Sequence, residues 1–126
     1  MNKNRVMAMF SNEKYIVLET FRKNDNSVKT PVWFVEYEDL IWIVTRELTG
    51  KVNRLKNNNK VNVAVSNFSG KVKGKWFSGK AKKVQGELAE KIISLRNKKY
   101  GIMAKLIGIF SVKKGKYVVY SIKLDH

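Results

Sequence analysis

The chain has 126 residues, 44% of them hydrophobic, and a formal net charge of +16; we expect residues 1–126 to form a single domain with a real hydrophobic core. It contains no Cys, and its only His is the last residue, His126. This excludes disulfides, thiolate nucleophiles and Cys-ligated metals, and it argues against His-based acid–base or metal chemistry. The protein must therefore work through binding, or through a cofactor that brings its own chemistry.

The N-terminal residues predict no targeting segment. Residues 1–5, Met-Asn-Lys-Asn-Arg, are not followed by the apolar h-region of a signal peptide. No long uncharged apolar run could form a transmembrane helix. Together with the lack of Cys, these features lead us to expect a cytoplasmic protein with no membrane partner.

The first part of the chain predicts three strands. Tyr15–Phe21 is β-branched and aromatic, and Arg22–Ser27, rich in Asn and Asp, follows as a turn. Pro31 stands at the head of a predicted strand over Val32–Glu36, because proline is tolerated at the first residue of a strand or on an edge. Leu40–Thr45 is almost continuously hydrophobic, which predicts burial on both faces.

The stretch Thr49–Leu55 predicts a helix start that carries its own cations. Thr49 is the expected N-cap, whose hydroxyl would accept a hydrogen bond from the first turn, and Gly50 would let a ligand approach the backbone. Lys51 and Arg54 then lie one turn apart on the same side. A helix start presents unpaired N–H groups and partial positive charge, so this is a candidate phosphate site. The alternative is a surface helix whose basic residues face water.

The surroundings of this helix favour an anionic ligand. No Asp or Glu occurs between Leu48 and Gly86, and 21 of the 26 basic residues of the chain are Lys. Charge of this size suggests a polyanionic partner, namely nucleic acid, an acidic membrane surface or a phosphorylated small molecule. Lys enrichment disfavours the bidentate base contacts that Arg makes, while a solubilising surface stays an alternative. The basic residues of the acid-free stretch are Lys51, Arg54, Lys56, Lys60, Lys71, Lys73, Lys75, Lys80, Lys82 and Lys83.

The second part of the chain predicts three further strands. Val61–Val65 alternates between apolar and polar residues, and Ser69–Gly74 reads as a loop or hairpin. Trp76–Val84 follows as a strand in which Gly79 would mark a bulge. Tyr117–Leu124 is the last strand.

A second helix is predicted over Glu87–Lys99, with Gly101 as its C-cap. The segment Ile102–Phe110 is ambiguous. The elements together predict a mainly β (α+β) fold, a six-stranded antiparallel barrel with two or three short helices. No GxGxxG or Walker A pattern is present, so neither a Rossmann nor a P-loop fold has support. The apolar face of the second helix consists of Leu88, Ala89, Ile92, Ile93 and Leu95.

A series of short motifs resembles the split β-barrel flavin and deazaflavin oxidoreductases related to pyridoxamine 5′-phosphate oxidase, with the small members that use coenzyme F420 as the nearest branch. The most specific pair is the Thr-Pro-Val-Trp-Phe strand and the Gly-Lys-Val-Asn-Arg-Leu helix start at this spacing. The first hairpin departs from the family, with Asn and Ser where an Asp-Gly turn is usual. The segments that carry the resemblance are residues 18–23, 30–34, 45, 50–55, 61–64 and 76–81.

The resemblance implies a homodimer that binds F420 or FMN in grooves at the subunit interface and acts on a small-molecule substrate. It implies that Lys51, with the backbone of Gly50 and Val52, holds the cofactor phosphate and that Arg54 assists. Thr30, Pro31, Val32 and Trp33 would line the tricyclic ring, Val44 and Thr45 would flank the ribityl chain or phosphate, and Trp76 would reach in from the partner subunit. We expect Trp42 to be a core residue, and no residue is singled out as catalytic.

Three functions compete at this point. The first is an oxidoreductase that transfers a hydride, which needs stacking of cofactor and substrate more than acid–base groups. The second is a non-catalytic FMN-, haem- or tetrapyrrole-binding module of the same fold. The third is a basic nucleic-acid-binding β-barrel, which is the least favoured. The acidic tail of F420 suits the basic surface better than FMN does, which tilts the expectation towards the deazaflavin.

Overall fold

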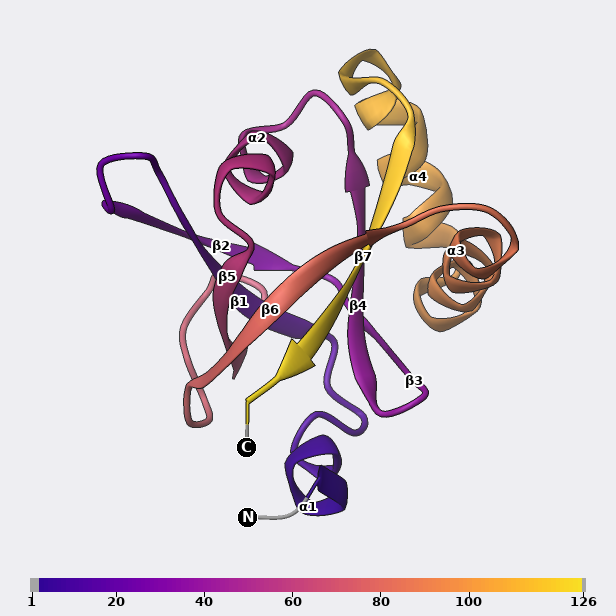
Figure 1. Ribbon diagram of the computed structural model, residues 1–126. Helices are drawn as coiled ribbons and strands as arrows, with labels where there is room; N and C mark the ends of the chain where they lie inside the picture. Colours follow the sequence, from indigo (N-terminus) through magenta and orange to yellow (C-terminus); the bar gives the residue numbers. More distant parts are fainter. Residues whose placement is uncertain (1–2, 126) are drawn as a thin grey trace.

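A computed structural model describes residues 3–125 as one antiparallel sheet that curls into a split barrel (Figure 1). The strand order is β2-β1-β5-β6-β7-β4-β3, so β2 and β3 are the two edges. The strands are β1 (Tyr15–Phe21), β2 (Ser27–Val32), β3 (Val35–Tyr37), β4 (Leu40–Arg46), β5 (Lys60–Ser66), β6 (Phe77–Val84) and β7 (Tyr117–Leu124). The helices are α1 (Lys3–Ala8), α2 (Gly50–Asn57), α3 (Glu87–Tyr100), α4 (Ile102–Ser111) and the 3₁₀ turn η1 (Val112–Lys114).

The split-barrel fold is confirmed, but the described residues form seven strands where six were predicted and four α-helices where two or three were predicted. The predicted strand Val32–Glu36 is wrong, because β2 ends at Val32 and a separate strand, β3, begins at Val35. Pro31 lies near the end of β2, paired with Val17 of β1. Its missing N–H costs no ladder bond there, since β2 is an edge strand. Ser27, assigned to the turn, is the first residue of β2.

Two apolar clusters hold the sheet. The larger one fills the barrel and includes Ile41 and Ile43 of β4, and Phe10, which follows α1, packs edge-on against Phe34 with ring centroids 6.0 Å apart. The second cluster lies between α3 and the outer face of β3, β4 and β7, and includes Trp42. The residues of β4 therefore enter both clusters in alternation, which confirms the burial of both faces and the core role of Trp42.

Gly79 lies in a regular ladder and does not mark a bulge. It pairs with Val61 on one side and Leu124 on the other, in registers without an inserted residue. A Cβ atom at this position would lie 2.6 Å from the carbonyl oxygen of Lys123. The glycine is required because the neighbouring backbone comes too close for any side chain.

The segment left ambiguous by the sequence is α4, which follows α3 after a turn at Gly101. Gly101 has φ 58°, and its N–H donates to the carbonyl of Asn97, which confirms it as the C-cap of α3. Figure 1 places α3 and α4 on one side of the sheet, beside β4 and β7, and α2 on another. None of the helices within residues 3–125 is long and apolar enough to cross a bilayer.

Candidate cofactor site

Helix α2 presents the cationic residues that the sequence singled out. The helix follows the end of β4 after a three-residue connection, and Val52 and Leu55 anchor it in the barrel core. Val52 is 1% exposed, so only its backbone can contribute to a surface site. This anchoring fixes one face of the helix and leaves the positions of Lys51 and Arg54 at the surface, half-buried.

Thr49 occupies the N-cap position of α2 with an extended backbone, but the predicted side-chain cap is wrong. Its hydroxyl donates to the carbonyl oxygen of Arg46 at 2.9 Å, towards the preceding strand. The first turn of α2 contains no acidic residue. The N-terminus of the helix therefore has neither a side-chain cap nor a carboxylate to offset its partial positive charge.

The guanidinium group of Arg54 folds back over the start of its own helix. Its Nε donates to the hydroxyl of Thr20, a fully buried residue of β1, at 2.6 Å. A Cβ atom added to Gly50 would lie 2.7 Å from a terminal nitrogen of Arg54. Gly50 therefore makes room for the arginine, and Thr20 holds the guanidinium in place.

Like charges gather around Lys51 without a compensating acid. Burial, and then the charges of Arg54 and Lys114, lower the pKa of Lys51. Burial and the charge of Arg22 lower the pKa of Arg54. The charges that act on these two groups are thus all positive. A cluster that is desolvated and self-repelling in the free protein gains stability when an anion binds to it.

The predicted ring-lining residues follow the edge strand β2. Thr30, Pro31 and Val32 pair with Leu18, Val17 and Ile16 of β1. Thr30 and Val32 are half-buried, and Pro31 is exposed. Because β2 has a strand on one side only, no strand within the described residues pairs with the backbone of its outer edge.

Trp33 lies just beyond β2 and stacks on Tyr100 of α3, with ring centroids 4.2 Å apart and planes inclined by 5°. One face of its indole is therefore occupied within the chain. Trp76 is 39% exposed and lies beside β2, where the ammonium group of Lys29 is 5.3 Å from its ring centroid. Its predicted reach into a partner subunit stays a prediction.

Val44 and Thr45 lie at the end of β4, paired with Val119 and Val118 of β7. Both are half-buried and lead directly into the connection to α2. Thr20 connects the cationic cluster at α2 with the strand that carries the predicted ring-lining residues. It accepts a hydrogen bond from Arg54 and pairs with Val28 of β2. The fold thus brings the start of α2 close to the first half of β2, while Trp33 lies past the other end of that strand.

A cluster on α3 was missed by the sequence analysis. Arg96 is 5% exposed, and its guanidinium lies 5.5 Å from the ring of Trp33 and 4.9 Å from that of Tyr117. The Tyr100 hydroxyl accepts the N–H of Phe34 at 3.0 Å. Burial raises the pKa of Tyr100 to about 12. The signal was present in the spacing, because residues 92, 96 and 100 recur every four positions on the buried face of α3.

Lys99 is the other perturbed group on α3. Its ammonium donates to the carbonyl oxygen of Phe34 at 2.9 Å and lies 3.7 Å from the Phe34 ring centroid. Burial lowers the pKa of Lys99 to about 8, against the opposing effect of Glu36. No group of three or more His, Cys, Asp or Glu residues within residues 3–125 could hold a metal ion.

The curled antiparallel sheet with a cationic helix start beside an open edge strand defines the protein class as a split β-barrel domain. The chain belongs to the pyridoxamine 5′-phosphate oxidase family, whose model matches residues 3–126. The resemblance in the motifs is thereby confirmed at the level of the family. No relative was found among curated proteins.

Solved structures with the same fold have diverse functions. A conserved hypothetical protein from Mycobacterium tuberculosis superposes with a TM-score of 0.75 at 16% identity, covering 100% of this chain and 82% of the other. The haem storage protein HutZ from Vibrio cholerae gives 0.72 at 12% identity, covering 98% and 89%. An F420 reductase gives 0.64 at 13% identity, covering 94% and 92%. At these identities the similarity shows a shared fold.

Proposed function

We propose that this protein is an oxidoreductase that binds F420, or alternatively FMN, as a homodimer and transfers a hydride to or from a small organic substrate. The observation that carries the proposal is the acid-free cluster around Lys51 and Arg54 at the start of α2. A phosphorylated cofactor supplies the negative charge that this cluster lacks, because phosphate binds both to the N–H groups of a helix N-terminus and to adjacent cations. The F420 reductase that shares the fold shows that a split barrel can serve deazaflavin chemistry.

The residues of the chain would divide the work of binding. Lys51 would pair with the phosphate, and the backbone N–H groups of Gly50 and Val52 would donate to it. Arg54, held by Thr20, would supply a second charge without moving. The bound cofactor supplies the hydride chemistry, so the protein has to orient the two reactants and exclude water.

The edge strand and the end of β4 would complete the groove. Thr30, Pro31 and Val32 offer the open edge of β2 to the ring, with Trp33 beyond them, and Val44 and Thr45 lie on the chain that leads to the phosphate site. A second subunit across this edge, with Trp76 at its margin, would enclose the ring. The homodimer is therefore part of the proposal.

Cofactor binding tests the proposal directly. We would titrate the purified protein with F420 and with FMN, follow cofactor fluorescence, and mix reduced cofactor with quinones and enones. Lys51→Ala should weaken cofactor binding by on the order of tenfold or more, because a charge-assisted phosphate contact is lost. The matched control is Lys56→Ala, an exposed cation on the same helix, which should leave the affinity unchanged.

The competing functions give different results in the same set of experiments. Tight binding of F420 or FMN without turnover would indicate a cofactor-binding module. A haem titration tests the haem- or tetrapyrrole-binding module. The only His that could serve such a module as an iron ligand is His126, which lies outside the described residues. Oligonucleotide binding that falls steeply with salt, without cofactor binding, would support the nucleic-acid barrel and refute the proposal. Equal affinity of Lys51→Ala and wild type would place the phosphate elsewhere.

A further inference from the structure

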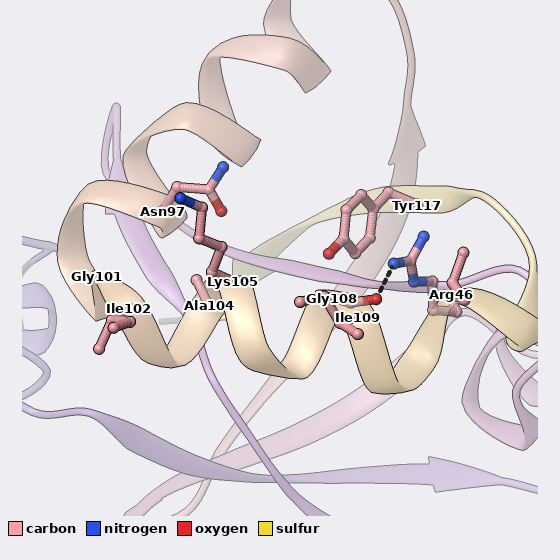
Figure 2. Close-up of a pocket in the computed structure, with 10 residues that line it drawn as sticks. Arg46, Asn97, Gly101, Ile102, Ala104, Lys105, Gly108, Ile109 and Tyr117 are labelled. Atoms are coloured by element: carbon pink, nitrogen blue, oxygen red, sulfur yellow. Dashed lines mark hydrogen bonds between the residues drawn. The ribbon is translucent and has the colours of Figure 1, made fainter.

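Helix α4 packs against the rest of the domain through its small residues and leaves its large apolar residues exposed. It turns its small residues inward, where Ala104 is 4% exposed and a Cβ atom on Gly108 would lie 2.9 Å from the Tyr117 hydroxyl. On the same side, Arg46 donates to the carbonyl of Gly108 at 2.9 Å (Figure 2). It also donates to the hydroxyl of Ser111 at 3.0 Å. Residues 104, 108 and 111 follow the helical repeat and define this inner face.

The rest of the surface of α4 carries large apolar side chains that are exposed, and two of them, Ile102 and Ile109, also line the pocket beside Gly108. Phe110 is 83% exposed, and Ile102 and Ile109 are 74% and 66% exposed. Val112 of η1 and Leu48 extend the surface, and the N–H of Leu48 donates to the carbonyl of Lys114 at 2.9 Å. A concentration of exposed large apolar side chains on one segment of a domain surface indicates an interaction site. We call it the α4 face; its members are Leu48, Ile102, Met103, Leu106, Ile107, Ile109, Phe110 and Val112.

Exposed lysines lie close to the α4 face along the chain. The chain contains no Asp or Glu between residues 91 and 124. Glu47 contacts this region, and its carboxylate accepts the backbone N–H of Lys116 at 2.6 Å. The exposed basic residues near the two ends and the edge of α4 are Lys98, Lys105, Lys113, Lys114 and Lys116.

A partner for this surface must therefore be apolar at its centre and anionic around it. A second copy docked through the α4 face would place the same lysines against one another, because a two-fold interface brings identical patches together. Residues 91–124 contain no acid, and Glu47, which contacts this region, could pair with one of these lysines only, so most of them would stay unpaired in such a contact. An anionic bilayer offers both requirements at once, with acyl chains for the apolar side chains and phosphates for the lysines.

We propose that the protein binds peripherally to anionic lipid bilayers through the α4 face, with the apolar side chains inserted among the acyl chains and the flanking lysines on lipid phosphates. The helix has ten residues, so it would lie in the plane of the surface. The expectation of no membrane partner rested on the lack of a spanning segment, which peripheral binding does not need. The proposal does not depend on the cofactor site.

Vesicle flotation tests the inference on the full chain. We would compare vesicles of phosphatidylcholine alone with vesicles that also contain phosphatidylglycerol, at several NaCl concentrations. We expect binding to the mixed vesicles, weaker binding as salt rises, and little binding to the neutral ones. Absence of binding to both kinds of vesicle, or equal binding to both, would overturn the proposal.

Paired variants locate the contact. Ile109→Gln/Phe110→Gln should lower binding to the mixed vesicles at least tenfold, whereas Phe68→Gln, at a 74% exposed phenylalanine in the β5–β6 connection, should not. Lys105→Gln/Lys113→Gln should lower it by about fivefold for each lysine. Lys71→Gln/Lys75→Gln removes the same charge from exposed sites elsewhere and should have a smaller effect.

Sedimentation velocity separates lipid binding from self-association. If the α4 face meets the bilayer, the double variant Ile109→Gln/Phe110→Gln keeps the oligomeric state of the wild type and loses only vesicle binding. If the variant instead changes the oligomeric state and keeps its binding to vesicles, a second copy covers the face and the proposal is wrong.

Discussion

Arg46 connects the barrel to the segment that carries the α4 face, so its removal should cost more than that of any ordinary surface arginine. Its three guanidinium nitrogens donate to the Ser111 hydroxyl and to the carbonyls of Gly108 and Gly115, at 3.0, 2.9 and 3.0 Å. The guanidinium also lies 3.7 Å from the ring centroid of Tyr117. Each hydrogen bond from a charged group contributes about 1.5–3 kcal/mol.

These contributions do not add, because the three bonds belong to one half-buried side chain. We therefore expect Arg46→Ala to lower the free energy of unfolding by about 3 kcal/mol. For a domain of this size that corresponds to a fall in Tm of about 10 °C. Arg46→Lys keeps the charge but loses the planar fork, so it should recover only part of the loss.

Urea denaturation followed by tryptophan fluorescence measures this change, and amide hydrogen exchange shows whether α4 opens first. The matched control is Lys23→Ala, an exposed cation in the first turn, which should stay within about 0.5 kcal/mol of wild type. If Arg46→Ala were as stable as this control, with unchanged exchange in α4, the guanidinium would not hold the helix and the argument would fail.

Two further predictions concern close packing and pH. Gly79→Ala places its Cβ against the Lys123 carbonyl and should destabilise the protein by about 2–4 kcal/mol in urea titrations, whereas Gly74→Ala, with ordinary contacts only, should be nearly neutral. Burial lowers the pKa of Lys99 from 10.5 to about 8 and raises that of Tyr100 from 10.0 to about 12. Between pH 8 and 10 the unfolded chain holds a proton that folded Lys99 has released, so stability should rise with pH. Above pH 10, Tyr100 ionises in the unfolded chain before it does in the folded protein, so this residue should make the stability fall as pH rises. The assignments would be contradicted if the Tyr100→Phe variant kept the fall or if the Lys99→Met variant kept the rise.

Local patterns in the sequence were sufficient for most of the barrel. The strands β1, β4, β5 and β7 were predictable because burial leaves a trace in the residues themselves, either alternation as in Val61–Val65 or an almost continuous apolar run as in Leu40–Thr45. The helix start at Gly50 and its cations were predictable in the same way, as was the C-cap at Gly101. The family followed from two motifs at a fixed spacing.

Tertiary structure decided the features that depend on distant partners. The short edge strands β2 and β3 are held by pairing with β1 and β4, so their own residues specify them weakly. The need for glycine at position 79 arises from the Lys123 carbonyl, 44 positions away along the chain. The hydroxyl of Thr49 turns towards Arg46 because β4 ends there.

The cationic helix start and α4 both show which features the local sequence determines and which depend on tertiary contacts. Sequence alone determined that Lys51 and Arg54 share one side of a helix in an acid-free stretch, because helical geometry fixes residues three apart. Only the fold showed that Thr20 anchors Arg54 and that Lys114 approaches Lys51. Likewise, the sequence left the segment Ile102–Phe110 ambiguous, and only its packing against Tyr117 and Arg46 decided which of its side chains face outward. Composition determines which side chains are apolar, but only the contacts between elements decide which of them are buried.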